Sequence, residues 1–258
     1  MAWLRRWVPR PGARLRLLCF PCAAGSAAAY RTWAGRLPEH IEVLGVELPG
    51  HGDRRGEPLL YSVGDVVDGL LDECGELLRR PVAVHGHSMG ALLALEFARG
   101  MRRLTGHPPA ALLVASCEAP ADRGQGGRWV PALANGHARD LLRDLGGIGA
   151  QVLSDERMMS ELMPMLHADV ELMDAYRPGP AAPLRCPVRV YAGTDESGLS
   201  ADGLAAWRRE NPADFLLSRL PGGHFFLRDN EPLYLARIAR DLTGTQQNGA
   251  VRWIPSNS

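Results

Sequence analysis

The sequence predicts an α/β fold in which helices cover both faces of a mostly parallel sheet. Short apolar runs alternate along the chain with longer segments of helical periodicity, an order typical of parallel sheets. Several of the apolar runs have no polar face, which indicates strands that are buried on both sides. The chain of 258 residues is long enough to bury a large core without disulfide bonds.

Six strands and three flanking helices are the elements with the clearest patterns. The strands are expected at residues 14–20, 41–48, 81–85, 110–115, 188–192 and 215–220. Pro or Gly directly follows the first three strands, and such residues commonly end strands. The helices are expected at about residues 88–103, 199–209 and 232–242.

Residues 121–180 interrupt the alternation, because they have helical patterns and no good strand. Helices are expected there at residues 138–145, 155–166 and 169–176. The segment is either a lid over an active site or a fixed subdomain that only adds packing. The chain is thus divided into a core of residues 1–120 and 181–243, the helical insertion, and a polar tail of residues 244–258 that we expect to be flexible.

Composition excludes several classes of protein. The 29 basic and 29 acidic residues give a net charge of zero, so no basic excess indicates a nucleic-acid partner. No apolar stretch approaches the roughly 20 residues of a membrane span, and no signal peptide is evident, so we expect a cytoplasmic protein. Five scattered cysteines argue against a disulfide framework. Cys19 and Cys22 could be a redox pair or half a zinc site, but without a second pair we interpret them as reduced thiols.

The strongest local signal is Gly-His-Ser-Met-Gly at residues 86–90, which fits the pattern G-x-S-x-G. An expected strand precedes it and an expected helix follows it, which is the context that this motif requires. The sharp turn would hold Ser88 in a strained conformation with its hydroxyl above the sheet. Ser88 would also lie at a helix N-terminus, where backbone N–H groups favour developing negative charge. We therefore predict that Ser88 is a catalytic nucleophile.

A serine nucleophile needs a general base, and His224 is the candidate. In this motif's fold the chain order is serine, acid, histidine, and His224 follows the last expected strand. Gly222 and Gly223 would let its loop turn back toward the serine. His85 and His87 flank the serine too closely to act as its base. Four others lack the placement and are interpreted as surface or lid histidines: His51, His107, His137 and His167.

The acid that orients the histidine is predicted to be Asp195, which follows the fifth expected strand. Glu196 is adjacent and could compete for this role. Glu118, just after the fourth strand, is a second alternative. An oxyanion hole needs two backbone donors. One is expected to be the N–H of Met89, and the other the N–H of Cys22, with that of Ala23 as the next candidate.

Taken together, these motifs resemble the type II thioesterases, which belong to the α/β-hydrolase fold and have a helical lid. The resemblance covers about residues 15–242 and is carried by residues 20–25, 48–50, 86–91 and 222–227, with further similarity at 145–147 and 164–169. The Gly-Gly-His-Phe-Phe segment is the most specific part. Two departures from the family pattern stand out. His51 follows Leu-Pro-Gly where the family often has Arg, and the loop of residues 193–198 lacks the Pro of the family's Gly-Asp-Asp-x-Pro-like acid loop.

The resemblance implies an editing enzyme of polyketide or nonribosomal peptide biosynthesis. It would hydrolyse acyl groups from the phosphopantetheine thiol of acyl or peptidyl carrier domains, without a metal or dissociable cofactor. Carrier domains would be its partners, guided by an Arg-rich rim, and a monomer is the default expectation. A carboxylic-ester hydrolase or an acyltransferase could use the same scaffold. A non-catalytic protein that binds carrier domains or acyl ligands is the alternative of another class.

Overall fold

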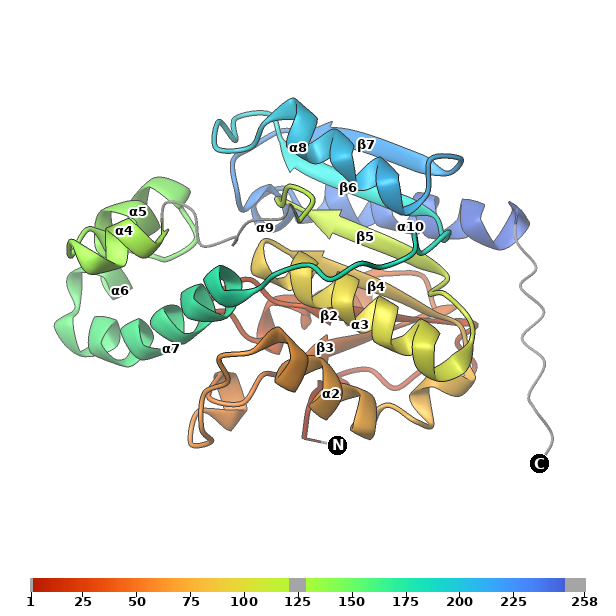
Figure 1. Cartoon of the computed structure of the whole chain (residues 1–258), viewed down its shortest axis with the longest axis horizontal. Coiled ribbons are helices and arrows are strands. Elements are labelled where there is room, and N and C mark those ends of the chain that lie inside the picture. Colours follow the sequence, from red (N-terminus) through yellow and green to blue (C-terminus); the bar gives the residue numbers. More distant parts are fainter. Residues whose placement is uncertain (1, 121–128, 249–258) are drawn as a thin grey trace.

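The computed structural model describes residues 2–120 and 129–248, and its centre is a seven-stranded sheet (Figure 1). The strand order is β1-β3-β2-β4-β5-β6-β7, in which only the pair of β1 and β3 is antiparallel. The strands are β1 (Leu4–Arg5), β2 (Leu15–Phe20), β3 (Ile41–Val46), β4 (Val82–His87), β5 (Ala111–Ala115), β6 (Val188–Gly193) and β7 (Phe215–Leu220). The six expected strands are therefore confirmed. β1 was not predicted, because two residues are too few to show a periodic pattern.

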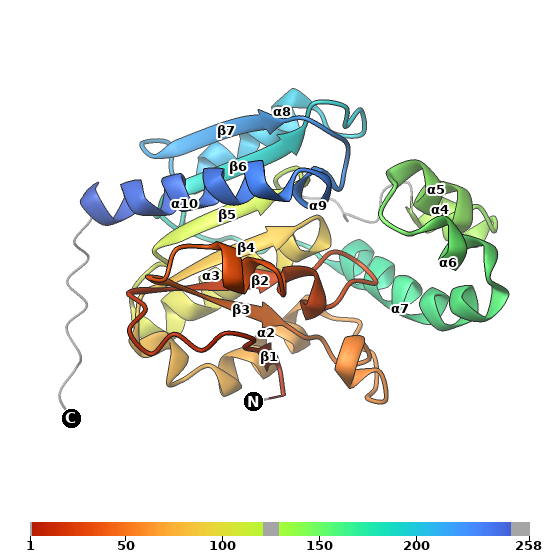
Figure 2. The same cartoon turned by 180° about the vertical axis from the view of Figure 1, so that it is seen from behind.

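Alternation of side chains along the strands builds one apolar layer on each face of the sheet. Leu18 of β2 packs in the layer that includes α2 (Val63–Glu73) and α3 (Met89–Thr105). Leu17, its neighbour in the chain, lies in the opposite layer with α10 (Glu231–Asn248). Figures 1 and 2 show these helices on opposite faces of the sheet. Both faces are covered, as the uninterrupted apolar strands predict.

Shorter helical elements complete the core. They are η1 (Ala27–Tyr30), α1 (Trp33–Arg36), η2 (Gly52–Arg54), η3 (Leu77–Arg79), α8 (Ala201–Ala205), η4 (Ala206–Glu210) and α9 (Phe226–Asp229). The expected helix at residues 199–209 is thus a short α-helix continued by a 3-10 helix. Within the part of the chain that the structure describes, no helix is both long and apolar enough to cross a membrane.

The insertion forms a separate group of helices at one side of the core (Figure 1). Its helices are α4 (Trp129–Ala134), α5 (Ala138–Leu145), α6 (Ala150–Ser154) and α7 (Glu156–Ala175). Two helices were expected where α7 runs without a break, and Pro164 lies inside it. Ala168 and Asp169, at the expected break, are buried, so packing against the core favours the continuous helix. The first residues of the insertion, 121–128, lie outside the described residues.

The C-terminal helix α10 continues to Asn248, further than the expected end at residue 242. Residues 244–248 of the expected flexible tail therefore belong to this helix. The rest of that tail, residues 249–258, lies outside the described residues.

His85 of β4 is buried among aromatic rings and links the sheet to α10. Its Nε2 lies 2.8 Å from the hydroxyl of Tyr234, and the rings of Tyr30, Trp33 and Tyr234 surround it. Burial lowers the pKa of His85 from 6.5 to about 3, so the imidazole is neutral in the folded protein. The unfolded chain binds a proton that the folded chain excludes over this range of pH.

We expect this histidine to make the protein acid-labile. Because its folded pKa lies below its unfolded pKa, the neutral His85 contributes fully to the free energy of unfolding above pH 6.5. This contribution falls as the pH drops toward 3. The slope is about 1.4 kcal/mol per pH unit for each such group. His87, also buried with a lowered pKa, adds to the same slope. Urea denaturation of wild type and His85→Gln between pH 4.5 and 7.5 should show that the free energy of unfolding depends less steeply on pH in the variant. Identical slopes in the two proteins would contradict the assignment of a neutral, buried His85.

Candidate active site

Ser88 lies in the sharp turn between β4 and α3, with φ 55° and ψ −119°. Positive φ is strained for a residue with a side chain, and such strain is typical of functional turns. A Cβ on Gly86 would lie 2.1 Å from the carbonyl oxygen of Gly90. One on Gly90 would lie 2.2 Å from the carbonyl oxygen of Phe20. Both glycines are therefore required because β4, α3 and the end of β2 approach so closely at this turn.

His224 is brought to the same place by the loop between β7 and α9. Its carbonyl oxygen lies 2.9 Å from Nε2 of His87 and 3.1 Å from the hydroxyl oxygen of Ser116. The ring centroids of His87 and His224 are 5.0 Å apart. Because His87 directly precedes Ser88, these contacts bring the His224 loop beside the serine turn. A Cβ on Gly193 would lie 2.2 Å from the carbonyl oxygen of Gly222, so the end of β6 also touches this loop.

The carboxylate that contacts His224 belongs to Glu196. Its Oε1 lies 2.5 Å from Nδ1 of His224. Its Oε2 accepts hydrogen bonds from the Ser116 hydroxyl at 2.9 Å and from the Gly193 N–H at 3.4 Å. Burial raises the pKa of Glu196, but the hydrogen bond and charge of His224, with these two donors, outweigh it and lower the pKa below 4.5. The carboxylate is therefore held ionised against the imidazole.

Asp195, the predicted acid, does not occupy this position. Its side chain is exposed and accepts a 3.0 Å hydrogen bond from the hydroxyl of Thr194, while its N–H donates to the carbonyl oxygen of Gly222 at 3.0 Å. The loop thus aims the side chain of Asp195 outward and that of the following residue inward. Glu118, the other alternative, accepts from the N–H of Ser200 at 2.5 Å. The geometry favours the adjacent glutamate, which the sequence had left as an alternative.

The two predicted oxyanion donors lie on segments that pack together. Met89 is the first residue of α3, where backbone N–H groups lack partners within the helix. The loop that carries Cys22 and Ala23 follows β2, and the carbonyl oxygen of Pro21 lies 2.5 Å from where a Cβ of Gly90 would be. Burial and the charge of Asp169 raise the pKa of the Cys22 thiol to about 12, so this thiol is protonated near neutral pH.

The insertion contacts the loop that carries the histidine. The guanidinium of Arg228 donates to the carbonyl oxygens of Gly147 at 2.8 Å and Gly146 at 3.0 Å. The ring of Phe225 lies 2.0 Å from the place of a Cβ on Gly147, so a side chain there would displace this ring. The insertion therefore borders the site, and the turn between α5 and α6 is joined to it by the hydrogen bonds from Arg228.

His51 does not lie where its sequence context predicts. It was expected on the surface or in the lid, but it is buried and its Nε2 lies 3.1 Å from Oδ2 of Asp169 in α7. The partners are 118 residues apart in the chain, and no local pattern signals their contact. The departure from the usual residue after Leu-Pro-Gly was the one visible hint.

Comparison with known proteins gives consistent matches over most of the chain. The profile of the Thioesterase domain family matches residues 15–243. The gramicidin S biosynthesis protein GrsT of Aneurinibacillus migulanus is 34% identical over 226 residues, which cover 85% of this chain and 85% of that protein. Thioesterase PikA5 of Streptomyces venezuelae is 33% identical over 228 residues, 88% of this chain and 80% of that one.

Solved structures give the same picture. The type II thioesterase BorB from the borrelidin biosynthetic cluster has a TM-score of 0.82 and 33% identity, and the match covers 94% of this chain and 98% of that chain. RedJ, a thioesterase from the prodiginine pathway of Streptomyces coelicolor, also has a TM-score of 0.82 and 33% identity, with coverage of 90% and 87%. The shared length therefore includes both the sheet and the helical insertion.

Proposed function

Because this chain belongs to the thioesterase family, we propose that it is a type II thioesterase of polyketide or nonribosomal peptide biosynthesis. It hydrolyses acyl groups from the phosphopantetheine thiol of carrier domains and restores the free thiol. The observation that carries the proposal is the His224 ring, which is bonded to a buried carboxylate and lies beside the strained Ser88 turn.

The reaction proceeds through an acyl-enzyme. The Oγ of Ser88 attacks the thioester carbonyl carbon while Nε2 of His224 takes the hydroxyl proton. The N–H of Met89 and that of Cys22 or Ala23 stabilise the oxyanion. The tetrahedral intermediate collapses, the C–S bond breaks, and the imidazolium returns its proton to the leaving thiolate.

The second half repeats these steps with water. His224 removes a proton from a water molecule, the hydroxide attacks the acyl-enzyme carbonyl, and the ester bond to Ser88 breaks. As the carboxylic acid leaves, the imidazolium of His224 returns its proton to Oγ of Ser88, which restores the serine hydroxyl. Glu196 remains ionised throughout, because its part is to hold Nδ1–H and to stabilise the imidazolium through a direct hydrogen bond.

The mechanism requires no metal or dissociable cofactor, because every reacting group belongs to this chain, the carrier or water. The phosphopantetheine arrives as part of the partner. The proposal keeps the cytoplasmic location expected from the sequence. The five cysteines, which are free thiols, are consistent with a reducing compartment.

The test compares one acyl group on three leaving groups: an acyl carrier protein, a small thiol and a simple alcohol. We expect kcat/KM to be highest for the carrier-bound thioester, by at least about tenfold, which corresponds to about 1.4 kcal/mol of contact with the carrier. A preference for the alcohol ester would instead identify a carboxylic-ester hydrolase. Transfer of the acyl group to an added thiol or alcohol in place of water would identify an acyltransferase.

A fluorophosphonate probe separates the enzyme from a binding protein. Mass spectrometry should find the adduct on Ser88, because only an activated serine reacts. A protein that binds the carrier but neither hydrolyses the thioester nor takes the label would contradict the proposal.

A further inference from the structure

A chain of buried polar groups joins helix α7 of the insertion to two loops of the core. Oδ2 of Asp169 accepts the backbone N–H of Ala24 at 2.6 Å and lies 3.1 Å from Nε2 of His51. Nδ1 of His51 lies 2.9 Å from the carbonyl oxygen of Pro49. The side chains of His51 and Asp169 are only 3% and 2% exposed, so water does not compete for these bonds.

The partners of His51 favour its protonated form. A carbonyl oxygen can only accept, so Nδ1 must carry a proton to bond Pro49. An ionised carboxylate can also only accept, so Nε2 donates to Asp169 when both ring nitrogens carry protons. The two acceptors thus favour the imidazolium form of His51, which makes a buried ion pair with the Asp169 carboxylate.

The bond to Ala24 matters because of where that residue lies. Ala24 has φ 54°, a left-handed conformation that a side chain disfavours. It directly follows Cys22 and Ala23, the candidates for the second oxyanion donor. The carbonyl oxygen of Cys22 accepts from the N–H of Gly25 at 3.0 Å, which closes the turn. Asp169 thus holds the strained residue of this turn from outside.

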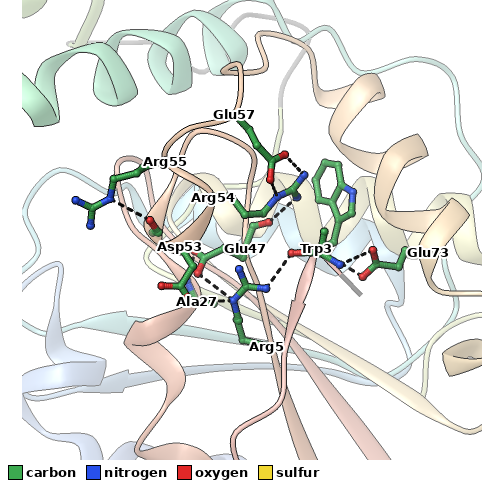
Figure 3. A network of polar contacts seen from close by, with 11 residues as sticks. Trp3, Arg5, Ala27, Glu47, Asp53, Arg54, Arg55, Glu57 and Glu73 are labelled. Atoms are coloured by element: carbon green, nitrogen blue, oxygen red, sulfur yellow. Dashed lines mark hydrogen bonds and ion pairs between the residues drawn. The ribbon is translucent and has the colours of Figure 1, made fainter.

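A network of polar contacts surrounds the residues that follow His51 in its loop (Figure 3). The guanidinium of Arg54 bonds Glu57 and the carbonyl oxygen of Glu47 and lies 4.6 Å from the ring centroid of Trp3. The carboxylate of Glu47 fills the space beside Gly52, where a Cβ would lie 2.5 Å from its Oε1. The loop that presents His51 to Asp169 therefore packs against Glu47, which follows β3, and Trp3, which precedes β1.

We propose that His51 and Asp169 are positioning residues for the oxyanion hole, which they couple to the docking of α7. Asp169 holds Ala24, and His51 holds Asp169, so that the N–H groups of residues 22 and 23 point at the oxyanion. This inference rests on the proposed function, because it assigns these residues to the same acyl-transfer site.

The pair also predicts a pH dependence. Burial lowers the pKa of His51, but the hydrogen bond and charge of Asp169, the Pro49 carbonyl and the charge of Glu47 outweigh it and raise the pKa above 6.5. The nearby thiol of Cys22 stays protonated, since its pKa is about 12. A raised folded pKa means that the ion pair is complete below pH 6.5 and is lost as the pH rises through the folded value.

The test measures Asp169→Asn and His51→Gln against Glu171→Gln, an exposed acid on the same helix. Asparagine keeps the volume of Asp169 but not its charge. We expect kcat on a small-thiol thioester to fall about 10- to 100-fold in the first two variants, with KM within about threefold, as for a misplaced oxyanion donor. In wild type, kcat should decline as the pH rises and the ion pair of His51 and Asp169 is lost. This decline should disappear in His51→Gln, whereas Glu171→Gln should match wild type.

Two outcomes overturn the inference. One is a folded Asp169→Asn protein whose kcat stays within twofold of wild type. The other is a decline of kcat with pH that is unchanged in His51→Gln. If wild type hydrolyses no thioester, the proposed function fails, and the rate of Ser88 labelling by a fluorophosphonate tests the inference instead, because the phosphoryl oxygen binds the same donors. Equal labelling rates in all variants would then reject it.

Discussion

Ser88→Ala should lower kcat for thioester hydrolysis by on the order of 10⁴-fold or more, with no loss of fold. Without Oγ there is no acyl-enzyme, and His224 has no hydroxyl proton to take. Alanine retains the same Cβ at φ 55°, so the strain of the turn is unchanged. Single-turnover assays with a carrier-bound acyl group should show no covalent acylated protein.

The control for this substitution is Ser160→Ala, which removes a hydroxyl from the exposed face of α7. This variant should retain wild-type kcat and should still take the fluorophosphonate label. Activity within tenfold of wild type in Ser88→Ala would mean that another group performs the attack. Cys22 and Cys117 are poor substitutes, since the pKa of each thiol is raised to about 12.

The serine turn could be predicted because its steric requirement is written in adjacent residues. Gly86 and Gly90 stand where any Cβ would overlap the backbone, and that requirement is visible as a short motif. The strands were predictable for a similar reason, since their burial on both faces leaves continuous apolar runs. In both cases the physical constraint acts on neighbours in the sequence.

The carboxylate that contacts His224 was not predictable in the same way. Asp195 and Glu196 are adjacent carboxylates in one loop, and only the direction of each side chain separates them. That direction depends on backbone bonds between the end of β6 and the loop after β7, such as the bond from the Asp195 N–H to the carbonyl oxygen of Gly222. The spacing of residues in the sequence does not determine which of the two carboxylates turns inward.

The role of His51 was hidden for a related reason. Connecting segments usually run over the surface, so an exposed histidine was the natural expectation there. Its burial depends on Asp169, whose own segment was predicted as the start of a separate helix. The continuous helix α7 places that carboxylate over the core, and only then does His51 acquire a partner.

Glu196→Gln should lower kcat by about 10⁴-fold, whereas Asp195→Asn should change it by less than about threefold. An amide can still accept at one atom but cannot stabilise the imidazolium, and its NH₂ group would disturb the tautomer that Glu196 imposes on His224. Because the pKa of Glu196 lies below 4.5, the carboxylate is ionised at every assay pH above that value. The loss should therefore be nearly constant from pH 6 to 9.

The two substitutions form a matched pair, since each removes one negative charge from the same loop. Any general effect of charge on carrier binding would appear in both, mainly in KM. A loss of kcat confined to Glu196→Gln isolates the contact with His224. A large loss in Asp195→Asn and a small one in Glu196→Gln would instead mean that the loop rearranges when substrate binds. The exposed Asp195 side chain would then have to turn inward, leave Thr194 and displace a carboxylate that now bonds Ser116, Gly193 and His224. Breaking those three bonds to make one is unfavourable, which is why the geometry favours Glu196.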